Sequence, residues 1–133
     1  MTASRELSVS INRSAAEAYE FLSVPENFPK WASGLSTSLR RAGGKWIAET
    51  PEGPVTVRFS GRNSSGVLDH WVTLKNGTSI HIPLRVVAKG GGCDLILTLI
   101  RQPDMSDEKF AADADWVKRD LLAAKRLLEA QKT

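Results

Sequence analysis

The chain has 133 residues, of which 41% are hydrophobic and 25% are charged, and its formal net charge is +3. This length suits a single domain with its own core, so we expect one domain over residues 1–133. The basic residues occur in scattered pairs among acidic ones. A nucleic-acid surface needs a concentrated basic stripe, so nucleic-acid binding is not expected. The single cysteine excludes an internal disulfide and a zinc site made of several cysteines.

The sequence predicts no membrane anchor. Its first residues lack the features of a secretion signal, and no apolar run approaches the roughly 18 residues that a membrane-spanning helix needs. We therefore expect an unanchored cytoplasmic protein.

The N-terminal segment predicts a strand followed by a helix. Apolar and polar residues alternate over residues 7–11, as in a half-buried strand. Ser14 and Glu17 then have the spacing of a capping box, in which a serine hydroxyl and a glutamate carboxylate satisfy free N–H groups at a helix start. A short helix is expected over residues 15–23, and Pro25 ends it.

Residues 25–32 contain two prolines, which suit a single turn or a short second helix. Their aromatic residues, Phe28 and Trp31, are expected to cover one edge of the core. Large aromatic side chains mostly fill cores, but Trp31 is also a candidate ligand contact.

The middle of the chain predicts an antiparallel meander. Glycine-rich turn signals recur roughly every 10 to 13 residues between positions 35 and 102, and none of them fits a phosphate-binding loop. With the N-terminal strand, the expected sheet has seven strands. The six strands of the meander are expected at about residues 35–41, 45–50, 55–62, 67–75, 79–88 and 93–101.

Alternation within these strands predicts which side chains face the core. Phe59, Leu84 and Leu97 belong to the apolar sets of their strands. In the strand at 67–75, the more apolar set includes His70, which we therefore expect to point inward.

The C-terminal segment predicts one long helix over residues 106–130. Apolar residues recur at steps of four and three from Phe110 to Leu128, with Ser106 as a plausible N-cap. Val117 and Leu121 belong to this stripe, and Trp116 lies at its edge. The stripe needs a wide apolar surface, so we expect the helix to lie against a curved sheet with a pocket between them.

This order of elements resembles the helix-grip fold of the START-related ligand-binding superfamily, also called SRPBCC. The resemblance covers nearly the whole chain. It is carried by the glycine-punctuated strands, by the N-terminal segment SVSINRSAAEAYEFLSVPENFPKWA and by the final helix FAADADWVKRDLLAAKRLLEA. Within the superfamily, the chain is most similar to small bacterial proteins described as polyketide cyclases or dehydrases. The resemblance implies an α+β fold in which a seven-stranded antiparallel sheet curves around the C-terminal helix.

His70 is the clearest candidate for chemistry. An imidazole on an apolar inward face could orient a ligand hydroxyl or carbonyl, or transfer a proton, with Asp69 as a possible partner. Alternatively, it is a core histidine that is bonded to the backbone or to Asp69. Burial would lower its pKa. Because His81 is expected on the opposite face and no acidic cluster accompanies either histidine, no metal site is predicted.

Arg101 is the second polar candidate. It ends the last strand on the same face as Leu97, where it could meet an anionic group at a pocket mouth. The alternative is an ion pair with an acid of the final helix, such as Asp113.

Three functions remain open from the sequence. The first is binding of a small hydrophobic or aromatic molecule between the sheet and the C-terminal helix, without a cofactor, by a monomer or homodimer. The second is a cyclase- or dehydratase-like enzyme that uses His70 as acid–base catalyst, and the third is a protein-interaction module with a filled cavity. The candidate ligand-binding residues are Trp31, Trp46, Phe59, His70, Leu84, Leu97, Arg101, Trp116, Val117 and Leu121.

Overall fold

The computed structural model describes residues 4–32, 39–50, 53–61, 63–103 and 105–130. Residues 35–38 of the first predicted meander strand lie outside this part of the chain. The elements follow the predicted order. They are β1 (Ser4–Ile11), α1 (Ala15–Leu22), the 3-10 turn η1 (Pro25–Asn27), α2 (Phe28–Trp31), β2 (Leu39–Ala42), β3 (Lys45–Thr50), β4 (Gly53–Phe59), β5 (His70–Thr73), β6 (Ser79–Ile82), β7 (Leu84–Lys89), β8 (Gly92–Ile100) and α3 (Asp107–Ala130).

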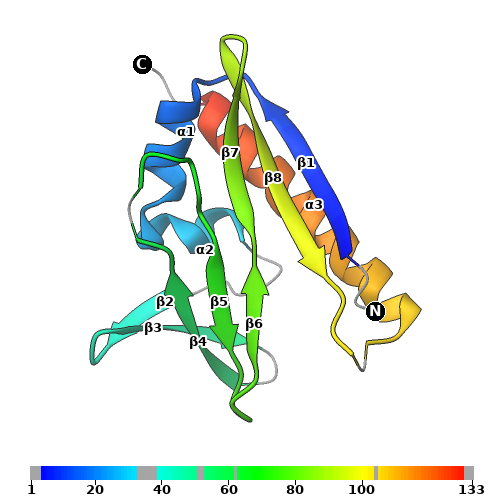
Figure 1. The fold of residues 1–133 in the computed structure, drawn as a ribbon. Coiled ribbons are helices and arrows are strands. Elements are labelled where there is room, and N and C mark those ends of the chain that lie inside the picture. Colours follow the sequence, from blue (N-terminus) through cyan, green and yellow to red (C-terminus); the bar gives the residue numbers. More distant parts are fainter. Residues whose placement is uncertain (1–3, 33–38, 51–52, 62, 104, 131–133) are drawn as a thin grey trace.

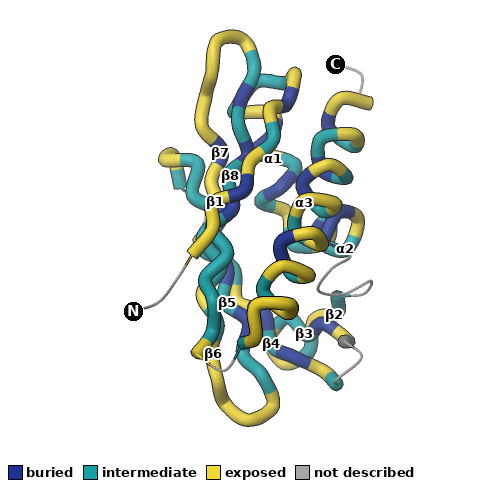
Figure 2. The backbone as a smooth tube through the Cα atoms, turned by 90° about the vertical axis from the view of Figure 1, so that its right-hand side faces the viewer, coloured by how far each residue is buried: buried dark blue, intermediate teal, exposed yellow. Residues whose placement is uncertain are grey.

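Strands β1, β5, β6, β7 and β8 lie on one side of the molecule and the helices on the other, while the end of the sheet with β2 and β3 curves beneath the helices (Figure 2). Helix α3 runs behind β1, β8 and β7 (Figure 1) and packs on β1 and β8, with α2 at its side. The predicted α+β class, the two short helices after the first strand and the long C-terminal helix held against antiparallel strands are all confirmed.

The strands form two antiparallel sheets, which corrects the prediction of one sheet of seven strands. One sheet has the order β1–β8–β7 and the other has the order β2–β3–β4–β5–β6. The extra strand arises because the predicted strand at 79–88 divides at Pro83, whose nitrogen carries no hydrogen for the ladder. Before the proline, β6 pairs with β5, and after it β7 pairs with β8.

The two sheets stay joined by backbone hydrogen bonds around this break. Leu68 N donates to Leu84 O at 2.7 Å, and Val86 N donates to Gly66 O at 2.9 Å. The segment before β5 therefore pairs with β7, which shortens the strand predicted at 67–75. Inward alternation continues across the break, since Ile82 packs against the core before Pro83 and Leu84 is buried after it.

Both predicted helix starts are capped by serine. Ser14 Oγ accepts from Glu17 N at 3.2 Å, and its hydroxyl donates to the Glu17 carboxylate at 3.0 Å. The glutamate thus bonds the serine hydroxyl, which differs from the backbone contact of a full capping box. At α3, Ser106 Oγ accepts from Lys109 N at 3.1 Å.

The predicted apolar stripe of α3 faces the core. Ala114, Leu121, Ala124 and Leu128 are buried, and Val117 is partly buried against the same cluster. This cluster also contains inward residues of β1, β7 and β8, so the helix and the three-stranded sheet share one core.

Candidate ligand pocket

A pocket of about 190 Å³ lies between the α1–α2 segment and the strands β4, β5 and β7. Among the described residues, its lining includes no member of α3 and no aspartate, glutamate, lysine or arginine. The lining residues, which define the pocket throughout, are Tyr19, Leu22, Ser23, Phe28, Trp31, Phe59, Ser60, Leu68, His70 and Leu84.

Local structure explains why these side chains meet. Tyr19 and Leu22 are three residues apart on α1, so they share the face of that helix that turns toward the sheet. Phe28 and Trp31 have the same spacing on α2 and are both buried. On the facing strands, alternation turns Phe59, His70 and Leu84 toward these two helices.

Aromatic rings form the densest part of the wall. The Phe28 ring lies edge-on to Trp31 and to Phe59, with 5.4 Å between ring centroids in both pairs. It is also edge-on to His70, at 5.2 Å. Edge-to-face contacts of this kind are the favoured geometry for aromatic pairs, and they hold the four rings in fixed relative orientations.

His70 is the buried polar residue of this wall, with 4% of its surface exposed. Its Nδ1 lies 3.4 Å from Leu68 O, and because a carbonyl oxygen only accepts, this contact requires the hydrogen on Nδ1. Burial lowers the pKa of His70 to about 4, while the Leu68 contact and the Asp69 charge raise it in part. The imidazole is therefore neutral at pH 7, and its Nε2 is a hydrogen-bond acceptor.

Trp31 lines the same pocket with its ring, but its N–H is enclosed by protein atoms. Its indole Nε1 is buried and has no hydrogen-bond partner among the described residues. An indole N–H can only donate, and leaving such a group buried without an acceptor costs about 1–3 kcal/mol. The pocket lining also carries the hydroxyl groups of Tyr19, Ser23 and Ser60, so His70 is one of several polar groups there.

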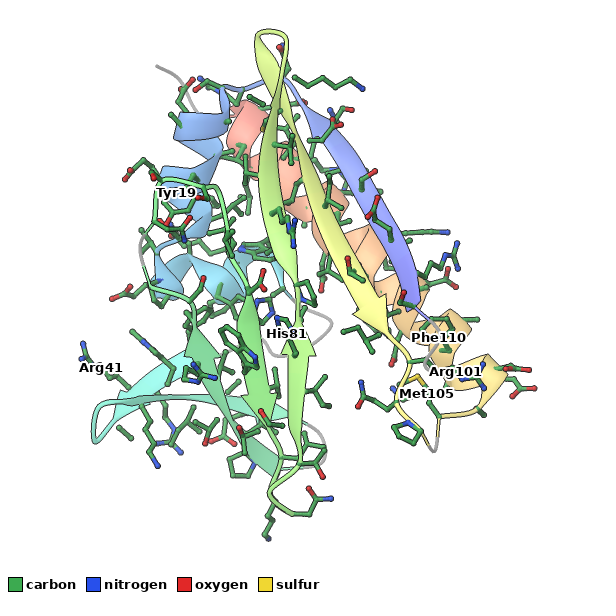
Figure 3. All side chains as sticks on the ribbon, viewed as in Figure 1. Tyr19, Arg41, His81, Arg101, Met105 and Phe110 are labelled. Carbon is green, nitrogen blue, oxygen red and sulfur yellow. The ribbon has the colours of Figure 1, made fainter. Side chains whose placement is uncertain are left out.

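Asp69 points away from the pocket, although it adjoins His70 in the sequence. Its Oδ2 lies 2.8 Å from His81 Nε2, and its Oδ1 accepts from Leu84 N at 3.0 Å. His81 stacks on Trp71 with 5.0 Å between ring centroids, on the outer side of the sheet (Figure 3). Successive strand residues face opposite sides, so Asp69 is placed to hold the sheets together and does not contact the His70 ring.

Four of the ten candidate ligand-binding residues meet in the pocket, namely Trp31, Phe59, His70 and Leu84. The other six lie elsewhere. Leu97, Val117 and Leu121 pack in the core between β8 and α3. Trp46 belongs to a second cluster on the five-stranded sheet, near Arg41 at the β2–β3 end (Figure 3).

The remaining two candidates lie at the surface of α3 and at its start. Trp116 is 45% exposed. Arg101 binds Met105 O at 2.8 Å and the Asp107 carboxylate at 2.6 Å, and it lies near the Phe110 ring (Figure 3). The alternative of an ion pair with an acid of the final helix is confirmed, but the partner is Asp107, the first residue of the helix, and Asp113 instead pairs with Lys109.

The sequence interpretation missed the contribution of α1. Tyr19 was not a candidate, yet it lines the pocket, and its hydroxyl accepts from Asn63 N at 2.8 Å (Figure 3). Its spacing of three from Leu22 was the available signal. Ser23, Ser60 and Leu68 carry no comparable signal, since they become wall residues only through long-range packing.

The described residues contain neither a metal site nor a membrane-spanning helix. No group of three or more histidine, cysteine, aspartate or glutamate side chains there could hold a metal ion. No helix there is long and apolar enough to cross a membrane.

No protein-family model and no curated protein matches the chain. Solved structures do match over nearly its whole length. The Aha1 dimer from Colwellia psychrerythraea has a TM-score of 0.73 at 13% identity and covers 98% of this chain and 99% of its own. A START superfamily protein from Mycobacterium smegmatis has a TM-score of 0.65 at 13% identity, covering 94% and 98%. The protein Ara h 8.0201 has a TM-score of 0.69 at 10% identity, covering 98% and 100%.

Proposed function

The chain has the helix-grip fold of START-related proteins, and we propose that it binds a small, largely apolar molecule in the pocket beneath α1 and α2. The observation that carries this proposal is a partly open pocket of about 190 Å³ lined by four aromatic side chains, of which Phe28 and Trp31 are buried and Phe59 is partly buried. Protein interiors are close-packed, and voids larger than a water molecule are few. A recess of this size beside the packed core, lined by aromatic side chains, therefore supports occupancy by a ligand.

The volume limits the size of the ligand. An apolar cavity of roughly 150 Å³ is large enough to hold benzene. The pocket, at about 190 Å³, suits a molecule with one ring and is small for a fused polycyclic product. Its place beneath α1 and α2 also differs from the location between sheet and C-terminal helix that the sequence favoured.

Binding is better supported than acid–base catalysis. His70 has a pKa near 4, so at pH 7 it is a neutral imidazole that lacks the extra proton a general acid gives up, and such a low pKa also makes it a weak base. The carboxylate of Asp69 is engaged with His81 and with the backbone of Leu84, so it does not orient the imidazole. A buried neutral histidine that accepts a hydrogen bond is suited to holding a ligand in one orientation.

Toluene is a suitable first probe because it has one ring and no polar group. We expect it to cause saturable chemical-shift changes in the labelled protein, centred on Phe28 and His70, with a Kd on the order of 1 mM or lower. The absence of saturable changes would contradict the proposed function.

Two substitutions locate the site. Ser60→Phe places a ring in the pocket and should abolish the toluene response, with Ser23→Phe as a second blocking variant. Val117→Phe is the matched control on α3, outside the pocket lining, and should leave the response intact. If Val117→Phe abolished the toluene response and the two serine variants kept it, the ligand would lie against α3. Circular dichroism establishes that each variant is folded.

A further inference from the structure

Tyr19 lies between two recesses that follow each other along α1. One is the pocket, and the other, which we call the outer groove, has a volume of about 440 Å³ and is more open. We propose that the ring of Tyr19 separates the two recesses and so restricts the ligand to one ring with short substituents. This inference rests on the proposed function, and it adds the residue that sets the size of the ligand. The outer groove is lined by residues 63–66 and by Ala15, Ala16, Tyr19, Glu20, Val86 and Ala88.

One side of helix α1 lines both recesses in order. Ala15 lines the outer groove, Leu22 lines the pocket, and Tyr19 lines both. These three residues are separated by steps of four and three, so they follow each other along one face of the helix. Tyr19 is therefore at the boundary between the two recesses.

Strand β7 repeats this order on the opposite wall. Ala88 and Val86 line the outer groove, and Leu84 lines the pocket. Alternate residues of a strand project to the same side of a sheet. Helix α1 and strand β7 pass each other in opposite directions (Figure 1), so position 15 corresponds to position 88 and position 22 to position 84. The outer groove and the pocket are thus successive parts of one trough between this helix and this strand.

The side chain of Tyr19 is held at both of its ends. It begins on α1 and is 9% exposed, and its hydroxyl accepts from Asn63 N at 2.8 Å (Figure 3). The loop that supplies this N–H is fixed by the Asn63 side chain, which accepts from Ser65 N and Val67 N and donates to Gly61 O and Val67 O. Moving the ring aside would break the bond to Asn63 N, and removing one partner of such a bond is unfavourable. Tyr19 is therefore a fixed wall between the recesses.

This wall determines whether a longer ligand binds more tightly. Each methylene group that moves from water into an apolar site tightens binding about fourfold. With Tyr19 in place, a tail that exceeds the pocket stays in water and adds no affinity. Without the ring, the tail can continue along the trough into the outer groove and become buried there.

Benzyl alcohol and 4-phenyl-1-butanol are the matched probes, because they share a ring and a hydroxyl and differ by three methylene groups. The quantity to measure is the ratio of their Kd values in one variant, from the same chemical-shift titration. In the wild-type protein we expect the two Kd values to agree within about threefold. In Tyr19→Ala, 4-phenyl-1-butanol should bind at least about tenfold more tightly than benzyl alcohol. The ratio cancels any loss of affinity that a variant imposes on both probes.

Three further variants control this measurement. Tyr19→Phe keeps the ring and removes only the hydroxyl that accepts from Asn63 N, so it should keep the wild-type ratio. Ala16→Trp, added to Tyr19→Ala, fills the outer groove and should restore the wild-type ratio. Tyr19→Leu also lacks the ring, and it replaces Tyr19→Ala if circular dichroism shows that Tyr19→Ala is unfolded.

The outcomes separate the two proposals. Equal ratios in the wild-type protein and in the variants without the ring would overturn the role of Tyr19 and leave the proposed function standing. A ratio that rises in Tyr19→Phe as much as in Tyr19→Ala, or that stays high after Ala16→Trp is added, would also overturn that role. Failure of both toluene and benzyl alcohol to bind the wild-type protein would overturn both proposals.

Discussion

His70 combines burial with the loss of its charge, and this makes the stability of the protein depend on pH. In the folded chain its pKa is about 4, because burial disfavours the imidazolium ion. In the unfolded chain the pKa is near the ordinary value of about 6.5, so as pH falls the unfolded state binds the proton first. The stabilising contribution is therefore complete above pH 6.5 and is lost as pH falls toward 4.

We expect this one residue to lower the free energy of unfolding by about 3 kcal/mol between pH 7 and pH 4. Urea unfolding at a series of pH values measures it, with His70→Leu as the comparison. The other titrating groups are the same in both proteins, so the difference between the two curves isolates the histidine. Parallel curves over this range would show that His70 is not buried in its neutral form.

At the scale of elements, helix α3 carries the strongest test of the fold. Leu121 is 2% exposed on the face toward the sheet, and its neighbour Leu122 is 43% exposed. Leu121→Asp would bury an unpaired carboxylate and should prevent folding or cost more than about 4 kcal/mol. Leu122→Asp should change stability by about 0.5 kcal/mol or less. Circular dichroism during thermal unfolding compares them, and similar melting temperatures would contradict the assigned helix face.

The elements that sequence reasoning predicted well are those whose signals are local. The three-and-four periodicity of α3, the serine caps at Ser14 and Ser106 and the alternation that turns His70 inward each depend on residues close in the chain. The division of the sheet at Pro83 also has a local signal, because a proline inside a predicted strand interrupts the ladder of hydrogen bonds. It was missed because the flanking apolar alternation continues through the proline without a change of face.

The pocket could be predicted only in part, because its walls meet through long-range packing. Alternation identified Phe59, His70 and Leu84 as inward residues, and the aromatic content of residues 25–32 identified Trp31. No local sequence pattern predicts that α1 and α2, rather than α3, cover this part of the sheet. Side chains of α3 were therefore assigned to a pocket that lies beneath the other two helices.

At the scale of the whole molecule, the pocket lies over the place where the two sheets part. Leu68 and Leu84, whose backbones join the segment before β5 to β7, both line it. Asp69 strengthens the same join by accepting from the Leu84 N–H. These hydrogen bonds between the segment before β5 and β7, which we call the join, hold two walls of the pocket at a fixed separation. A change that breaks the join should therefore affect both the stability of the protein and its affinity for a ligand.

Gly66 tests this dependence. It has φ +74°, and its carbonyl accepts from Val86 N, while a Cβ at this position would overlap the Val86 carbonyl oxygen. Gly77 has φ +91° with open space around it, so Gly77→Ala carries the cost of backbone strain alone. We expect Gly66→Ala to lower the free energy of unfolding by about 2 kcal/mol more than Gly77→Ala does, because β7 must also move away. Where Gly66→Ala still folds, toluene should bind more weakly than to Gly77→Ala, as measured by the same titration. Equal losses of stability and equal toluene affinities in the two variants would mean that the join between the sheets does not set the shape of the pocket.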